Sequence, residues 1–170
     1  MITRNKQCYS DGVCEENLSQ QTVAVERSKL LSRAMALCAK SEHCEGEIQE
    51  KLRAWGATEA DQASIMATLV EERYIDDERF SRAYIHDKLE YNHWGRKKIE
   101  QMLWAKGVDK AVFSPLLDAV DEEQWLSHLR PLIQQKRRSV KAANDYELTQ
   151  KLLRFALGRG FTYDEAMKVI

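Results

Sequence analysis

The chain contains 170 residues, enough for one compact domain or a row of small repeats, and its formal net charge at pH 7 is −1. Leu, Ala, Glu, Lys, Arg and Gln are abundant, whereas Gly and Pro number only 7 and 2, so the composition predicts an all-α protein. No stretch approaches the roughly 20 apolar residues of a membrane span, and the first residues lack the pattern of a secretion signal. We therefore expect a soluble, cytoplasmic protein with no membrane partner.

Charge is distributed unevenly along the chain. Residues 1–123 hold 17 Lys and Arg against 23 Asp and Glu, whereas residues 124–170 hold 9 against 4. A basic segment of this kind can mark a surface for nucleic acid or for an acidic partner, although solvated helix faces also carry charge. Composition alone leaves both interpretations open.

Residues 1–27 are expected to form a flexible tail, and three similar segments follow it. In each, an apolar stripe at helical spacing ends in a glycine. The segments are EIQEKLRAWGAT (47–58), KIEQMLWAKGVD (98–109) and LLRFALGRGFT (152–162), whose glycines are Gly56, Gly107 and Gly160. A glycine just past the last turn of a helix adopts the left-handed conformation that closes the helix. Each segment is therefore predicted to contain the end of one helix and the start of another.

The second helix of each segment has its own start signal. Thr58, Asp109 and Thr162 each stand two residues after a glycine, and all three are N-cap residue types. Thr162 and Glu165 also form the Thr-x-x-Glu pattern of a capping box. The sequence thus predicts a tight helix–glycine–cap–helix unit three times over.

A further helix is predicted ahead of each unit, over residues 28–40, 77–90 and about 123–138. Pro131 predicts a kink or a fresh start in the third. Together these elements predict three tandem three-helix repeats, spanning residues 28–75, 76–122 and 123–170. Such repeats form elongated, curved arrays in which neighbours cover each other's apolar faces, so we expect the chain to be a monomer.

The stretch ERYIDDERFSRAY (72–84) combines acidic and aromatic residues, and it is interpreted as the start of a helix. If Asp76 is the N-cap, its carboxylate accepts a backbone N–H from the first turn. Ile75 and Phe80 then occupy the two positions of a hydrophobic staple, which fixes the direction in which the chain enters the helix.

The neighbouring acidic residues fit the same interpretation. Asp77 and Glu78 would lie in the first helical turn, where the helix dipole favours negative charge. A catalytic acid pair is the alternative, but adjacent helical residues point about 100° apart and do not converge on one substrate. The whole motif, including Tyr74 and Arg79, is therefore predicted to be architectural.

Four stretches together resemble the RecX family of bacterial recombination regulators. They are YIDDERFSRAY (74–84), GRKKI (95–99), KGV (106–108) and KLLRFALGRGFTYDEA (151–166). The resemblance covers about residues 28–170. It departs from the family pattern at Met102, where an acidic residue is frequent, and at Trp104.

The resemblance implies a protein that binds the RecA recombinase, chiefly in its filament on single- or double-stranded DNA. It implies inhibition of the ATPase, strand-exchange and coprotease activities of RecA, and hence modulation of recombination, DNA repair and the SOS response. No enzymatic activity and no cofactor are implied. The absence of a Gly-rich nucleotide loop and of a nucleophile triad from the sequence agrees with a binding protein.

Three basic clusters and one tryptophan are the candidate contacts to RecA or DNA. Arg96, Lys97 and Lys98 begin a predicted helix, where positive charge opposes the helix dipole, so helix stability alone does not explain them. The other candidates are Lys136, Arg137, Arg138 and Lys141, then Lys151, Arg154 and Arg159, and finally Trp94. An exposed Trp94 ring could contact DNA or RecA, whereas Trp125 is predicted to be core. A solvated basic face remains the alternative for each cluster.

His43 beside Cys44 makes a metal site conceivable, but none is predicted. Cys8 and Cys14, like Cys38 and Cys44, are separated by five residues, which is not the Cys-x2–4-Cys spacing of common zinc modules. Free thiols are expected.

A stand-alone DNA-binding transcription regulator, with the helix–glycine–helix units as helix-turn-helix motifs, is the second hypothesis. It is the weaker one, because no predicted helix carries the mixture of Asn, Gln and Arg that recognises base edges.

Overall fold

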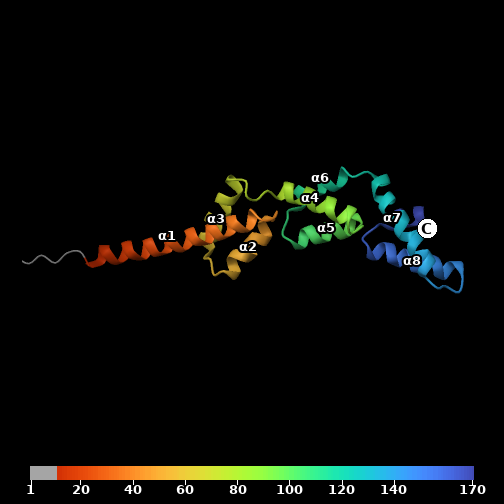
Figure 1. Ribbon diagram of the computed structural model, residues 1–170, viewed down its shortest axis with the longest axis horizontal. Helices are drawn as coiled ribbons and strands as arrows, with labels where there is room; N and C mark the ends of the chain where they lie inside the picture. The colour runs from red at the N-terminus through yellow and green to blue at the C-terminus, as the bar shows by residue number, and fades with distance from the viewer. Residues whose placement is uncertain (1–10) are drawn as a thin grey trace, which may run out of the picture. The chain divides into compact units, whose positions relative to one another are not determined.

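A computed structural model describes the backbone of residues 11–170 and the side chains from residue 25 onward (Figure 1). The helices are α1 (Asp11–Cys38), α2 (Glu45–Ala54), α3 (Glu59–Glu71), α4 (Asp77–Glu90), α5 (Arg96–Ala105), α6 (Lys110–Asp118), α7 (Glu122–Ser139), α8 (Asp145–Gly158) and α9 (Tyr163–Val169). This described part of the chain contains no strand, which confirms the all-α prediction. None of its helices has the length and apolar character needed to cross a membrane.

The chain forms two compact units. The first holds the described residues up to Ser41 together with Ile48–Tyr74, and in it α1 packs on α3. The second, called here the C-terminal unit, holds Glu42–Glu47 and Ile75–Ile170. The repeat boundaries predicted at residues 28, 76 and 123 stay predictions. Helix α1 begins at Asp11, so residues 11–27, expected to form a flexible tail, are helical; the first ten residues of that tail lie outside the described residues.

The three glycines close their helices as predicted. Gly56, Gly107 and Gly160 have φ angles of 81°, 83° and 92°. In each case the residue after the glycine donates its N–H to a carbonyl five residues earlier, as Phe161 does to Ala156 over 3.2 Å. This 6→1 bond is the Schellman motif, and it satisfies a carbonyl that the end of the helix leaves free.

The predicted N-caps are also present. Thr58, Asp109 and Thr162 all accept a backbone N–H from the first turn of the following helix. Thr162 and Glu165 make both hydrogen bonds of the capping box. Helix α7 runs through Pro131 without a fresh start, so that half of the prediction for Pro131 is wrong, while the alternative, a kink, stays a prediction.

The acidic motif starts helix α4. Asp76 is its N-cap and accepts the N–H of Arg79 over 3.0 Å. Ile75 and Phe80 are both buried, although the contact between them that defines a staple stays a prediction. The Asp77 carboxylate has a role that the sequence did not indicate, since it accepts the N–H of Glu45 over 2.8 Å at the start of α2.

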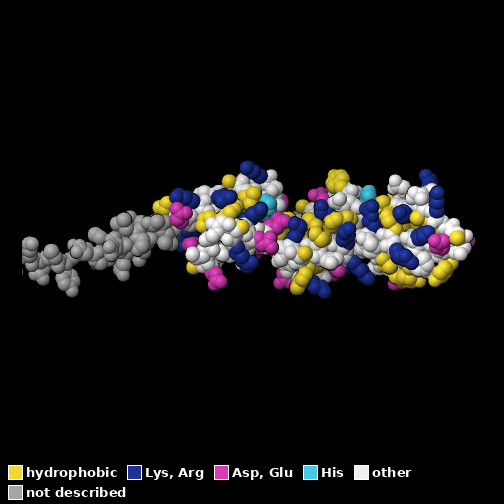
Figure 2. Space-filling model, turned by 90° about the horizontal axis from the view of Figure 1, so that it is seen from below, with side chains coloured by type: hydrophobic (Ala, Val, Ile, Leu, Met, Phe, Trp, Pro, Cys, Tyr) yellow, Lys and Arg dark blue, Asp and Glu magenta, His cyan; other side chains and the backbone are white. Residues whose placement is uncertain are grey.

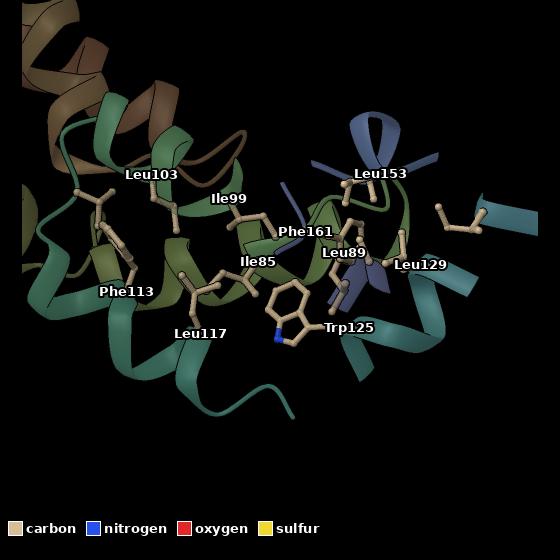
Figure 3. Packing of buried hydrophobic residues seen from close by; sticks show 14 of the residues in the cluster. Ile85, Leu89, Ile99, Leu103, Phe113, Leu117, Trp125, Leu129, Leu153 and Phe161 are labelled. Carbon is tan, nitrogen blue, oxygen red and sulfur yellow. The ribbon is translucent and has the colours of Figure 1, made fainter. Parts of the chain in front are cut away.

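The core of the C-terminal unit lies between α4, α5 and α6 and continues into α7, α8 and α9. Figure 3 shows Phe113 and Leu117 of α6 facing the apolar side chains of α4 and α5, and the Trp125 ring pointing into the same cluster. Trp125 is 3% exposed, which confirms its predicted place in the core. Phe161 is fully buried and joins this cluster from the connection between α8 and α9.

Candidate nucleic-acid interface

The start of α5 lies against the end of α8. Gly95 donates its N–H to the carbonyl of Arg159 over 2.8 Å, and Lys97 donates to that of Gly160 over 3.0 Å. Two of the N–H groups that a helix N-terminus leaves free are thereby satisfied by carbonyls at the C-terminal end of another helix, where the dipole is negative. We call residues 94–98 and 159–161 the C-terminal junction. It brings together the first and third basic clusters, which the sequence analysis treated as separate.

Glycine allows this close approach. A Cβ on Gly95 would lie 2.3 Å from the nitrogen of Phe161, and one on Gly160 would lie 2.4 Å from the Cβ of Lys98. Both distances are far below van der Waals contact. The close backbone approach therefore fixes the distance between the basic residues at the start of α5 and Arg159 at the end of α8.

Trp94 lies half-buried at this junction between two lysines. The ammonium of Lys98 lies 4.4 Å from the centroid of the Trp94 ring, and that of Lys88 lies 5.4 Å from it. Lys88 also lies 5.1 Å from the centroid of the Tyr84 ring. These are cation–π distances, which hold the charges in place without neutralising them. The Trp94 ring is thus only partly accessible to a nucleobase, and it holds two lysine ammonium groups in position.

Phe155 makes an equivalent arrangement on α8. The Arg159 guanidinium lies 5.3 Å and the Lys136 ammonium 5.4 Å from its ring centroid. Arg159 also donates a hydrogen bond from Nη1 to the carbonyl of Asn92 over 3.0 Å. The second and third basic clusters therefore meet at Phe155.

We call these two rings and their four cations the basic–aromatic band; it comprises Lys88, Trp94, Lys98, Phe155, Arg159 and Lys136. Figure 2 shows one face of the molecule, on which Lys and Arg side chains lie among hydrophobic ones over the C-terminal unit. Lys88 and Phe155 were missed by the sequence analysis. The i, i+4 spacing of Phe155 and Arg159 on one helix is a signal that could have identified Phe155.

Some predicted candidates have partners within the chain. Arg96 pairs with Asp118 at 2.6 Å and with Glu100 at 3.4 Å. Partial burial opposes its charge, but these carboxylates, Asp118 above all, raise the pKa of Arg96. Lys151 pairs with Glu147 at 2.6 Å and donates to the carbonyl of Lys141.

The remaining candidates differ in exposure and contacts. Arg137 donates to the C-terminal residue Ile170, so part of its hydrogen-bonding capacity is used. Lys97, Arg138, Lys141 and Arg154 are exposed. Exposed cations of this kind are the ones that a phosphate or carboxylate can reach at little cost.

The described part of the chain offers few groups for thiol or metal chemistry. Cys44 is a buried free thiol and Cys38 is half-buried, while Cys8 and Cys14 lie outside the described side chains. Burial raises the pKa of Cys44 to about 11, so the thiol is protonated near neutral pH. No group of three or more His, Cys, Asp or Glu with a metal-binding arrangement occurs among the described residues.

Comparison with known proteins identifies the family. Residues 76–113 match the family model of the second three-helix domain of RecX, and residues 122–170 match that of the third. The chain is 30% identical over 152 residues to the regulatory protein RecX of Acinetobacter baylyi, an alignment that covers 88% of this chain and 92% of that one. The chain belongs to the RecX family.

Longer relatives and solved structures extend the comparison. The chain is 30% identical to the regulatory protein RecX of Clostridium botulinum over 128 residues, which cover 74% of this chain but 59% of that one. It thus spans about three-fifths of the length of that relative. A crystal structure of regulatory protein RecX has a TM-score of 0.85 at 18% identity and covers 99% of this chain and 80% of its own. RecX from Lactobacillus salivarius has a TM-score of 0.80 at 20% identity, with coverage of 86% and 95%. Both likenesses confirm the all-α repeat fold.

Proposed function

We propose that this RecX-family chain is a non-enzymatic regulator that binds RecA and its filament on DNA, and that it inhibits the recombinase, ATPase and coprotease activities of RecA. Membership of the RecX family is the observation that carries this proposal. In the cell, the chain would act as a cytoplasmic monomer that moderates recombination and the SOS response.

The basic–aromatic band supports a filament as the partner. DNA phosphates and acidic protein side chains both favour a row of cations that is held in place before binding. In the band, Lys98 and Arg159 belong to different helices, but the glycine contacts of the C-terminal junction fix their backbones. Preorganised cations lose less side-chain freedom on binding, so more of the attraction contributes to affinity.

A RecA ATPase assay tests the proposed function directly. Added protein should lower DNA-dependent ATP hydrolysis by RecA at a ratio to RecA of one to one or below. An unchanged rate, together with filaments of unchanged length, would rule the proposal out. It would leave the stand-alone DNA-binding regulator as the hypothesis to pursue, and selection of a specific DNA sequence would then test that hypothesis.

Variants of the band locate the contact. Lys98→Ala combined with Arg159→Ala should weaken inhibition of RecA and leave the helical content unchanged. The matched control is Lys51→Ala with Arg53→Ala, which removes two exposed cations from the last turn of α2. Equal inhibition by the two double variants would assign the function to another surface.

A further inference from the structure

Trp104 lies in a groove of its own, separate from the band. It is 67% exposed, although burying an indole is normally favourable. The groove has a volume of about 290 Å³ and is lined by Lys97, Glu100, Gln101, Trp104, Lys110 and Phe113. This volume is at the lower end of the range for small-molecule sites, roughly 300–1,000 Å³, so it suits one planar group better than a large ligand.

The charge of the groove is positive. Lys97 and Lys110 are exposed, and neither ammonium forms an ion pair with any residue that the structure describes. The single acidic group, Glu100, is paired with Arg96 at 3.4 Å. The groove therefore presents an aromatic face with two available cations beside it.

Helix periodicity separates this groove from the band. Lys97, Gln101 and Trp104 stand at i, i+4 and i+7 and share one face of α5. Lys98 points about 100° away from Lys97, toward Trp94 in the band. A single helix thus carries two different candidate contact surfaces.

We infer that Trp104 stacks on one unpaired nucleobase of single-stranded nucleic acid, while Lys97 and Lys110 bind the adjacent phosphates. Every base offers a flat π face for such stacking, and lysines beside the ring match the backbone charge. In a duplex the base faces are covered by their neighbours, so only a single strand can occupy the groove. The inference deepens the proposed function, on which it rests for the nucleic-acid partner.

Binding of a poly-dT oligonucleotide to the full chain, followed by fluorescence anisotropy, tests the inference. Trp104→Ala should lower the affinity roughly 5- to 150-fold, the effect of losing one base–aromatic stack. It should leave the salt dependence of binding unchanged, because no phosphate contact is removed. Trp104→Phe should retain most of the affinity, and binding to duplex DNA should be the same for all three proteins.

Tyr146→Ala is the matched control, because Tyr146 is an aromatic residue of α8 that is 76% exposed. It should bind poly-dT like the unmodified chain. Equal affinity of Trp104→Ala and the unmodified chain, with both folded by circular dichroism, overturns the inference. Loss of RecA inhibition by Trp104→Ala without a change in poly-dT affinity also overturns it, by making the groove a protein contact. The RecA ATPase assay with the unmodified chain tests the proposed function separately.

Discussion

Two junctions of the C-terminal unit share a backbone design. At the N-terminal junction, formed by residues 42–47 and 106–108, a Cβ on Gly46 would lie 2.1 Å from the carbonyl oxygen of Lys106. At the C-terminal junction, the close approach is made by Gly95, the N-cap of α5, to Phe161, whereas Gly46 is the second residue of α2. In both, the start of one helix lies on the glycine-closed end of another, so glycine sets the spacing.

The two junctions differ in charge. At the N-terminal junction Glu47, one residue before Ile48, accepts a hydrogen bond from Lys106, one residue before Gly107. The corresponding positions at the C-terminal junction hold Lys98 and Arg159, which carry like charges. Opposite charges attract each other at the first junction, whereas the like charges of Lys98 and Arg159 repel each other at the second. The difference supports our proposal that the cations of the C-terminal junction bind a partner.

The largest expected effect comes from the residue that follows each closing glycine. Phe161→Ala should lower the free energy of unfolding by about 3–5 kcal/mol, because the ring is fully buried. Val108→Ala, at the same place in the N-terminal junction, removes two buried carbon groups and should lower it by about 1.6 kcal/mol. Urea denaturation measures the free energy of unfolding of both variants. Equal losses would contradict the larger loss expected for Phe161→Ala.

Gly95→Ala should have the next largest effect. Its Cβ would meet backbone atoms of Gly160 and Phe161 at 2.3–2.5 Å, and the expected loss of stability is about 3 kcal/mol. Gly56→Ala is the matched control, because no atom lies within 4 Å of its Cβ and only the φ of 81° is unfavourable, at about 1 kcal/mol. A Gly95→Ala protein as stable as Gly56→Ala would contradict the close approach.

The ion pair of the N-terminal junction predicts a pH dependence. Partial burial opposes ionisation of Glu47, but hydrogen bonds from Lys106 and His43 lower its pKa below the ordinary value of 4.5. A carboxylate with a lowered pKa stabilises the fold above its ordinary pKa, and the stabilisation disappears as the pH falls through the folded-state value.

Glu47→Gln should therefore cost about 1 kcal/mol at pH 7 and nothing in strong acid. Burial raises the pKa values of Glu45 and Asp77, whose effect on stability has the opposite sign. The difference between the variant and the unmodified protein isolates Glu47 from them. Thermal melts over a pH series make the measurement, and a constant difference down to strong acid would contradict the prediction.

The smallest expected effect distinguishes free from paired cations on α5. Lys97→Ala should lower the slope of log affinity for DNA against log salt by roughly 0.7–0.9, the value for one phosphate contact. Arg96→Ala should leave the slope unchanged, because Asp118 and Glu100 already hold the guanidinium. A larger change of slope for Arg96→Ala than for Lys97→Ala would show that the ion pairs open on binding.

Local patterns predicted the fold well because their causes are local. Gly107 closes a helix and Asp76 caps one through contacts within a few residues. The contacts that assemble the band join distant parts of the chain, such as Arg159 with Asn92. The periodic spacing of apolar residues in the sequence does not predict a contact between such distant residues.

The sequence therefore identified which basic and aromatic residues were candidates, but not which of them lie together on one surface. Sequence could locate Arg96 and Lys98 in one basic run, but not the pairing of Arg96 with Asp118. Nor could it reveal that Trp94 is half-buried under Lys98 while Trp104 is exposed. Which side of a helix meets a neighbour depends on tertiary packing, and this decides which cations remain available.

The central claim is that the cations of the C-terminal junction serve a partner. Lys98→Glu gives this junction the charge arrangement of the N-terminal one, with a carboxylate opposite Arg159. The measurement is inhibition of the RecA ATPase by this variant, with urea denaturation as the folding control. The account predicts at least a tenfold weaker inhibition with stability equal to or above that of the unmodified chain. Unchanged inhibition by a folded Lys98→Glu protein would contradict it.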